Sequence, residues 1–435
     1  MSPFEIGLIG IVVLFLLVFL GTRVGTAMLL VGFLGFAKVV SIEASLASAA
    51  RVSYETASNY GLTVIPLFVL MGAFALNSGI SARLYRAAHL SVGNFSGGLA
   101  IATIMACSGF AAICGSSPAT AATLGTVSVP EMIRYKYKPS LATGCVAAGG
   151  TLGILIPPSV GFIVYGIITE QSIIKLFSAG ILPGILLAFL FIITIYVWSK
   201  LDKSLAPPSG FESTLWQKVE VILRGVGETV ALFVLIMGGL FLGFFSPTEA
   251  AGIGACATLI IGLVRRKLSW SGFIHSVEES IKVTAMIFLV IIGAVVFSRF
   301  LAVTEVPTEL CSWIGSLGLP PIIILFFILF VYLILGTILD VVGMVLITVP
   351  IFFPVIVSIG FDPIWFGVIL MLVCEAALIT PPVGMNVYVI YGITKGKIPL
   401  EIIFKGILPF VLAIGLCILL LIFFKQIALF LPGLL

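Results

Sequence analysis

Four polar or glycine-rich interruptions inside long apolar stretches carry the residues that could do chemistry. They lie at 115–120, 149–159, 336–340 and 375–386, and two of them contain a Pro-Pro pair. Proline removes a backbone N–H donor and displaces the carbonyl four residues earlier, so two consecutive prolines break a helix. Freed carbonyl oxygens suit a hard cation such as sodium, and free N–H groups at a helix start suit a carboxylate. The pattern therefore predicts a site for an anion and a coupling cation.

Two acidic residues lie within these interruptions. Asp340 ends the third interruption and could either ligate a cation or cap the helix that follows it. Glu375 lies five residues before Thr380 and is either functional or an interior carboxylate satisfied by its neighbours. Both alternatives stay open at the level of sequence.

The apolar segments that contain the four interruptions are typical of a membrane protein. The chain has 435 residues, of which 61% are hydrophobic and 9% charged, and its mean hydropathy is +1.30. A soluble domain is about 45–50% apolar and about 25% charged. Apolar runs such as 181–197 are continuous rather than alternating, which favours helices over a β-barrel. We predict an all-α polytopic membrane protein with about ten transmembrane helices and two re-entrant helical hairpins.

The two halves of the chain repeat one another on either side of a polar linker at 199–218. Three motifs recur in the same order: Pro-Pro at 157–158 and 381–382, Tyr-Gly-Ile at 165–167 and 391–393, and Gly-Ile-Leu-Pro at 180–183 and 406–409. Such self-similarity predicts an internal duplication, and interrupted segments in corresponding positions point to the binding site.

Charges predict that the two repeats are inverted. The first half carries Arg83, Arg86, Arg134, Lys136 and Lys138 between its apolar segments. The corresponding segments of the second half, 304–319 and 360–363, carry acidic residues and no Lys or Arg. Because Lys and Arg mark cytoplasmic loops, equivalent loops should lie on opposite sides of the membrane, with both termini periplasmic.

Each repeat is expected to contain one hairpin and one broken helix. We place the hairpins at 98–133 and 322–360 and the broken helices at 139–168 and 363–392, because small, polar or proline residues interrupt each segment centrally. Ordinary membrane spans in place of the hairpins would leave the same orientation of the termini and are the alternative.

Five motifs carry a family resemblance that covers nearly the whole chain. They are GSSPATAATLG at 115–125, GGTLGILIPPS at 149–159, SPTEAA at 246–251, GTILD at 336–340 and ITPPVGMNVYV at 379–389. Together they resemble the large membrane subunit of TRAP (tripartite ATP-independent periplasmic, DctM-like) transporters of the ion transporter superfamily.

The resemblance implies sodium-coupled secondary uptake of an organic acid, such as a C4-dicarboxylate or sialic acid, across the bacterial inner membrane. It implies two protein partners, a separate small four-helix membrane subunit (DctQ-like) and a periplasmic substrate-binding protein (DctP-like). It also implies an elevator mechanism, with a scaffold formed by 1–60 and 219–281. The moving transport domain would comprise 61–198 and 282–425, and 199–218 would be a cytoplasmic linker.

The resemblance also implies site residues and at least two sodium ions. One sodium site would use Ser116, Ser117, Gly153, Ile156 and Pro157. The other would use Gly336, Ala377, Thr380 and Val383. The substrate carboxylate would lie near Ser117, Thr120, Ser159, Asp340 and Asn386.

Two other functions are weighed against this one. A stand-alone sodium/dicarboxylate or citrate symporter would share the architecture and lack the binding protein. A membrane-embedded enzyme would need a nucleophile with a base, but Ser116 and Ser117 have no His or Lys near them in the apolar segments. We therefore expect no enzymatic activity.

Overall fold

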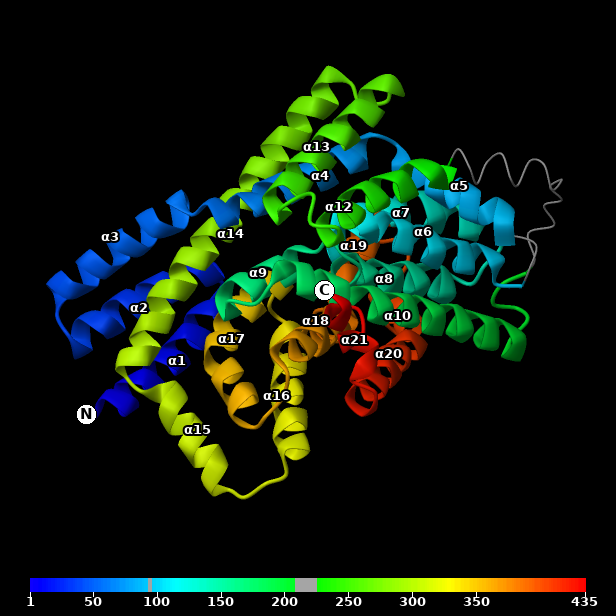
Figure 1. The fold of residues 1–435 in the computed structure, drawn as a ribbon. Helices are drawn as coiled ribbons and strands as arrows, with labels where there is room; N and C mark the ends of the chain where they lie inside the picture. The colour runs from blue at the N-terminus through cyan, green and yellow to red at the C-terminus, as the bar shows by residue number, and fades with distance from the viewer. Residues whose placement is uncertain (93–95, 208–224) are drawn as a thin grey trace.

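The computed structural model describes residues 1–92, 96–207 and 225–435, and its elements are helices throughout these ranges (Figure 1). The helices of the first half are α1 (Pro3–Phe19), α2 (Val24–Val39), α3 (Ile42–Ser58), η1 (Tyr60–Thr63), α4 (Val64–Asn77), α5 (Ile80–Val92), α6 (Gly98–Cys114), α7 (Ser117–Arg134), α8 (Pro139–Leu155), α9 (Val160–Thr169) and α10 (Ile173–Leu201). Of the predicted linker, 199–201 continue α10, whereas 208–218 lie outside the described residues.

The second half repeats this order from the helical stretch Gly225–Phe241 onward. Its elements are η2 (Val234–Gly238), α12 (Gly239–Phe241), α13 (Pro247–Val264), α14 (Trp270–Val303), α15 (Val306–Ser316), α16 (Pro321–Gly336), α17 (Val341–Ser358), α18 (Pro363–Ile379), α19 (Met385–Ile393), α20 (Leu400–Phe423), α21 (Gln426–Leu429) and η3 (Pro432–Leu434).

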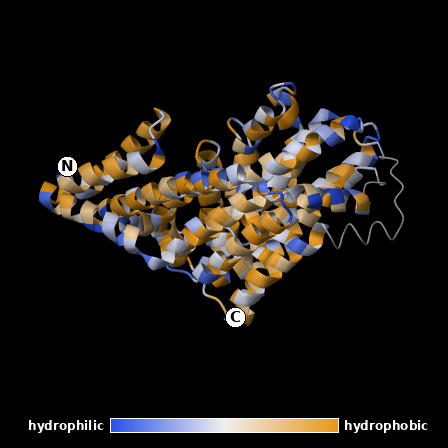
Figure 2. Cartoon of the chain, turned by 90° about the horizontal axis from the view of Figure 1, so that it is seen from above, coloured by the Kyte–Doolittle hydropathy of each residue, from blue (hydrophilic) through white to orange (hydrophobic). Residues whose placement is uncertain are grey.

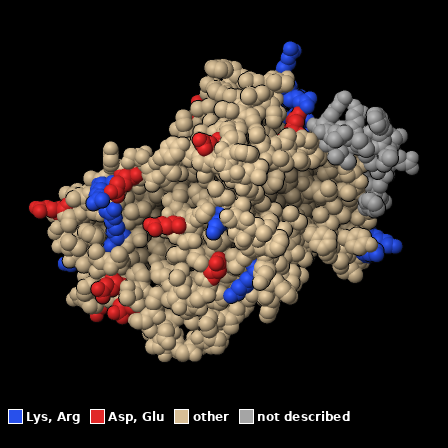
Figure 3. All heavy atoms as spheres, viewed as in Figure 1, with Lys and Arg blue, Asp and Glu red and all other residues tan. Residues whose placement is uncertain are grey.

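The surface is that of a membrane protein. Within the described residues, seven helices are long and apolar enough to cross a bilayer, and shorter apolar helices accompany them. One side of α20 exposes Leu408, Leu412 and Leu416 at helical spacing, as expected for a helix that faces lipid. Hydrophilic residues gather mainly at helix ends and loops (Figure 2), and few charged side chains interrupt the face seen in Figure 3. These observations confirm an all-helical, multi-pass membrane protein.

Each of the four ranges predicted as a hairpin or a broken helix contains two helices separated by a short break. Hairpin 1 consists of α6 and α7, and hairpin 2 consists of α16 and α17. Broken helix 1 consists of α8 and α9, and broken helix 2 of α18 and α19. In Figure 1 the two hairpins lie toward opposite sides of α8, α9 and α18.

The breaks are shorter than the sequence interruptions suggested. Residues 149–155 complete α8 and 375–379 complete α18, so only 156–159 and 380–384 are non-helical. Glycine alone costs about 1 kcal/mol in a helix interior, whereas proline also removes a hydrogen bond and clashes with the preceding turn. The Pro-Pro pairs therefore mark the breaks, and the glycines before them serve close packing.

Among the described residues, three amphipathic helices of more than ten residues fall outside the apolar segments on which the sequence prediction relied. They are α3, α5 and α15, whose polar residues alternate with buried ones such as Val52, Leu84 and Val306. An amphipathic helix at a surface has too few consecutive apolar residues to be recognised by a search for membrane spans.

The halves pack reciprocally. α2 packs against α14, while α13 packs against α4. In the same manner, α9 contacts α17 of hairpin 2, while α19 contacts α7 of hairpin 1. Each broken helix thus ends against the hairpin of the other half, which brings all four interrupted elements together.

Candidate functional site

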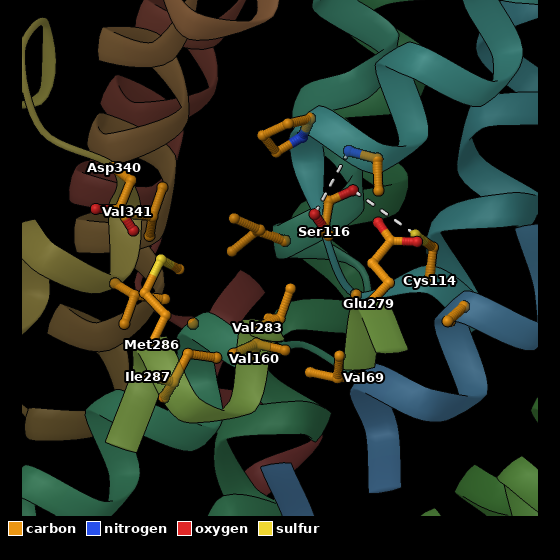
Figure 4. A pocket seen from close by; sticks show the side chains of 18 of the residues that line it. Val69, Cys114, Ser116, Val160, Glu279, Val283, Met286, Ile287, Asp340 and Val341 are labelled. Atoms are coloured by element: carbon orange, nitrogen blue, oxygen red, sulfur yellow. Dashed lines mark hydrogen bonds between the residues drawn. The ribbon is translucent and has the colours of Figure 1, made fainter. Parts of the chain in front are cut away.

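A cavity of about 460 Å³ lies where the interrupted elements meet. Both hairpin tips and both broken helices contribute to its walls, and α4 and α14 close one side. Figure 4 shows Asp340 of hairpin 2 across the cavity from Ser116 of hairpin 1, with Met286 and Ile287 of α14 below them. The lining is mostly apolar, and its ionisable acids are Asp340 and Glu279.

The tip of hairpin 1 is held tightly against broken helix 1. Gly115 has φ +64°, a conformation that favours glycine, and a Cβ there would lie 2.8 Å from the carbonyl oxygen of Pro158. A Cβ on Gly153 would lie 2.6 Å from the Ser116 carbonyl oxygen. The residues predicted for the first sodium site, Ser116 and Gly153 in particular, are therefore brought together.

Hydroxyl groups organise the same tip. Ser116 caps α7, because its Oγ accepts the Ala119 N–H at 3.5 Å. Thr120 Oγ1 donates to the Ser116 carbonyl oxygen at 2.8 Å. Across the break of broken helix 1, Ser159 Oγ accepts the Phe162 N–H at 3.4 Å and so caps α9.

A buried polar cluster lies behind this tip. Ser117 Oγ donates to Glu375 Oε2 at 2.8 Å and accepts from Asn386 Nδ2 at 2.9 Å. Asn386 Nδ2 also donates to the Ala147 carbonyl oxygen at 3.2 Å. All three side chains are fully buried, and they come from hairpin 1 and from both parts of broken helix 2.

The tip of hairpin 2 is longer and more open. Four residues, 337–340, separate α16 from α17, and Asp340 caps α17 by accepting the Gly343 N–H at 3.4 Å. A Cβ on Gly336 would lie 2.6 Å from that of Ala377, so this tip approaches α18 closely. Thr380 and Val383, also predicted for the second sodium site, follow on the break itself, where Val383 is 39% exposed.

The predicted substrate residues divide into two groups. Asp340 lines the cavity, as expected. The remaining four are buried behind the cavity wall: Ser117 and Asn386 belong to the polar cluster, Ser159 caps α9, and Thr120 donates to the Ser116 carbonyl oxygen. Ile156 and Pro157 belong to the break of broken helix 1 and precede Pro158, whose carbonyl oxygen lies 2.8 Å from the Cβ position of Gly115.

Sequence reasoning missed Glu279. It lies on α14, lines the cavity near Cys114 and Ser116, and has His275 4.0 Å away on the preceding turn. Glu279 lies just before Lys282 and the apolar segment that follows it. Sequence reasoning considered polar residues inside apolar segments and therefore did not consider Glu279. The available signal was an acidic residue on the turn directly before a spanning segment.

The remaining charged residues of interest have structural partners. Arg299 donates to Ser48 Oγ at 3.1 Å and pairs with Glu55 at 3.4 Å. Glu249 forms a capping box with Ser246 at the start of α13. Both charged residues therefore have structural partners.

Two helical hairpins facing two broken helices around a central cavity, within an apolar helical bundle, define a membrane transporter. The chain belongs to the DctM family: residues 11–427 match the family described as "Tripartite ATP-independent periplasmic transporter, DctM component". This is a family of transporter permeases rather than enzymes.

Curated relatives agree with this assignment. The chain is 37% identical over 390 residues to the C4-dicarboxylate TRAP transporter large permease protein DctM of Pseudomonas aeruginosa, covering 89% of this chain and 90% of that one. It is 31% identical to the sialic acid TRAP transporter large permease protein SiaM of Vibrio cholerae, covering 96% of each. It is 34% identical to the isethionate TRAP transporter permease protein DctMQ of Oleidesulfovibrio alaskensis, covering 83% of this chain and 56% of that one.

Solved structures share the fold. The YdaH transporter of Alcanivorax borkumensis matches with a TM-score of 0.61 at 13% identity, covering 90% of this chain and 88% of that one. MtrF of Neisseria gonorrhoeae matches with a TM-score of 0.57 at 13% identity, covering 86% and 83%. At this identity the likeness concerns the fold alone.

Proposed function

We propose that this chain is the large membrane subunit of a sodium-coupled TRAP transporter that takes up an organic acid. The observation that carries the proposal is the cavity, into which both hairpin tips and both broken helices converge. Relatives named for C4-dicarboxylates and sialic acid support a carboxylate as substrate.

The charge of the cavity supports coupling to a cation. Asp340 and Glu279 contribute two carboxylates to its lining, and among the described lining residues there is no Lys, Arg or His. An anion entering such an apolar enclosure is repelled unless positive charge accompanies it, because Coulomb energies grow as the local dielectric constant falls. Sodium ions held by freed carbonyls at the two hairpin tips would supply that charge.

The chain's own residues suggest where each ion binds. Hairpin 1 brings the Ser116 carbonyl oxygen against Gly153, and hairpin 2 brings Gly336 against Ala377. Backbone carbonyl oxygens suit a hard cation of sodium's size, and an ion at the first site would share the Ser116 oxygen with the Thr120 N–H and hydroxyl. Ions at these points would hold each hairpin tip against the broken helix that it faces.

The transport cycle would follow the elevator scheme. The two halves would form inverted repeats with about ten spans, both hairpins would be re-entrant, and both termini would be periplasmic. The scaffold predicted at 1–60 and 219–281 would extend to Val303, because α14 is continuous from Trp270 to Val303 and packs against α2. Residues 61–198 and 304–425 would then move against it. Sodium binding would close the hairpins and so favour movement of the loaded carrier.

Two further proteins would complete the system in the bacterial inner membrane. One is a small four-helix membrane subunit. The DctMQ relative supports that partnership, because its name joins M and Q and this chain covers only 56% of its length. The other is a periplasmic substrate-binding protein that would deliver the organic acid to the cavity.

Reconstitution tests the proposal. The chain is placed in proteoliposomes with its small subunit and its binding protein, and uptake of labelled C4-dicarboxylates and sialic acid is measured with an inward sodium gradient. We expect uptake that needs both the gradient and the binding protein. Uptake unchanged when potassium replaces sodium overturns the coupling, and full uptake without the binding protein would identify a stand-alone symporter.

A further inference from the structure

The buried Ser117–Glu375–Asn386 cluster links the two halves of the protein. Ser117 begins α7 of hairpin 1, whereas Glu375 and Asn386 lie on either side of the break in broken helix 2. The Ser117 hydroxyl occupies the centre, donating to Glu375 at 2.8 Å and accepting from Asn386 at 2.9 Å. The described structure thus joins elements 258 residues apart in sequence through one hydroxyl group.

The two ends of this link adjoin different proposed sodium sites. Ser117 directly follows Ser116, whose carbonyl oxygen faces Gly153 at the first site. Glu375 stands two residues before Ala377, which faces Gly336 at the second site. A shift of either hairpin tip is therefore transmitted across one hydrogen bond to the backbone that forms the other site.

The cluster is costly to disrupt. All three side chains are fully buried, and two of their oxygens, Glu375 Oε1 and Asn386 Oδ1, already lack a hydrogen-bond partner among the described residues. Breaking the Ser117 link would leave further polar atoms unpaired, and a buried unpaired group costs about 1–3 kcal/mol. The hairpin 1 tip and broken helix 2 are therefore both most stable in the one arrangement in which the hydrogen bonds of the cluster are formed.

The reciprocal position of the other half has no such link. Alignment of the helix N-caps and of the Pro-Pro pairs makes Val341 the counterpart of Ser117 and Thr151 the counterpart of Glu375. Val341 cannot form a hydrogen bond through its side chain, and Thr151 Oγ1 donates to Ala148 within its own helix. Within the described part of the chain, the hydrogen-bonded link between a hairpin and the other half's broken helix is therefore present at Ser117 and Glu375 and absent at this reciprocal pair.

We propose that the Ser117–Glu375–Asn386 cluster makes sodium binding at the two sites cooperative, with Glu375 acting as a positioning residue rather than as an ion ligand. This inference rests on the proposed function. An ion at one site fixes its hairpin tip, the cluster then orders the backbone of the other site, and the second ion binds with less ordering cost.

The test is a sodium titration of uptake and of melting temperature, made on the reconstituted complex and on the purified complex respectively. Glu375→Gln keeps an acceptor oxygen for Ser117 but removes the charge, and Glu375→Met removes the acceptor at similar volume. We expect a Hill coefficient of about 2 for the wild type and the Gln variant and about 1 for the Met variant.

A matched control lies on the same helix. Ser128 is also fully buried on α7, but its hydroxyl donates to Leu124 within that helix. Ser128→Ala should keep the wild-type Hill coefficient. If Glu375→Met does not fold, Ser117→Ala combined with Glu375→Gln replaces it and should lower the coefficient equally.

The outcomes separate the inference from the function on which it rests. Wild-type uptake that does not respond to sodium defeats the proposed function. A wild-type Hill coefficient near 2 that persists in Glu375→Met defeats the coupling alone. Loss of cooperativity in Glu375→Gln also defeats it, because the charge and not the hydrogen bond would then be required.

Discussion

The two hairpin tips differ in how far they are enclosed. Hairpin 1 turns within two residues, 115–116, and the break that it faces, Pro157 to Ser159, is buried. Hairpin 2 turns within four residues, and Pro381, Pro382 and Val383 of the break that follows Ala377 are exposed. The contact between hairpin 1 and the break that it faces is thus enclosed, and the corresponding contact of hairpin 2 is open.

This difference predicts unequal roles for the two proposed sodium sites. A sealed tip, held by backbone contacts and caps, is preorganised and changes little when an ion binds. An open tip samples more conformations, so ion or substrate binding changes its conformation more. We therefore expect damage at hairpin 1 to abolish transport, and changes at hairpin 2 to affect ion and substrate dependence.

Gly153→Ala should produce the largest loss. The new Cβ would lie 2.6 Å from the Ser116 carbonyl oxygen and 2.7 Å from Thr120 Oγ1, so the hairpin 1 tip must move away. We expect uptake to vanish while the protein still inserts into the membrane. Gly336→Ala, whose Cβ would meet Ala377 and the flexible Met344 side chain, should retain part of the activity.

Gly415→Ala is the matched control for this pair. It lies in α20 with nothing within 4 Å of an added Cβ, so it should leave uptake unchanged. Equal loss in the Gly153 and Gly336 variants would contradict the contrast between a sealed and an open site.

Asp340→Asn should have the next largest effect. Asparagine caps a helix about as well as aspartate, so α17 should remain stable. The charge facing the cavity is removed, however, and a hydrogen bond to a charged group is worth about 1.5–3 kcal/mol, or more than about tenfold in binding. We expect an unchanged melting temperature with uptake reduced at least about tenfold.

The two earlier interpretations of Asp340 are separated by this variant. Wild-type uptake in Asp340→Asn, together with destabilisation in Asp340→Ala, would mean that the residue serves only as a cap.

Glu279→Gln should have a moderate effect. The side chain is 47% exposed, so its attraction for a cation approaching the hairpin 1 tip is screened by solvent. We expect the half-saturating sodium concentration for uptake to rise about two- to fivefold with the maximal rate preserved. Glu278→Gln removes the neighbouring exposed charge, which does not line the cavity, and should change nothing.

The sequence predicted the interrupted elements well because their signals are local. Two prolines break a helix in any environment, so the breaks after Leu155 and Ile379 follow from residue type alone. The positions of hairpin tips follow in the same way from Gly115 and Asp340, a left-handed glycine and a helix cap.

What the sequence did not predict depends on contacts between distant segments. The Ser117–Glu375–Asn386 cluster forms because α19 returns to α7, which no local pattern encodes. Sequence reasoning placed Ser117 and Asn386 beside the substrate because both lie near breaks, but packing buries them behind the cavity wall. Glu279 lines the cavity only because α14 forms part of the cavity wall.

The smallest effect on stability is expected at the exposed ion pair between the start of α8 and the end of α10. Lys138, the N-cap of α8, pairs with Asp202 at 2.7 Å, and this pairing with Lys138 and Ser204 lowers the pKa of Asp202 to about 2. In the second half the charges are reversed: Asp362 caps α18, and Lys425 lies 4.8 Å from the Phe361 ring.

Asp202→Asn should lower the melting temperature at pH 7 by less than about 2 °C, because exposed ion pairs contribute little, and high salt should remove the difference. The folded pKa lies below the ordinary value of 3.8, so the pair's contribution is complete above that value and is lost as the pH falls through about 2. The difference from wild type should therefore be constant from pH 7 to pH 5 and shrink below pH 4. Lys425→Gln removes a cation from an aromatic face and should show no such acid dependence, so identical pH profiles for the two variants would refute this contrast between the halves.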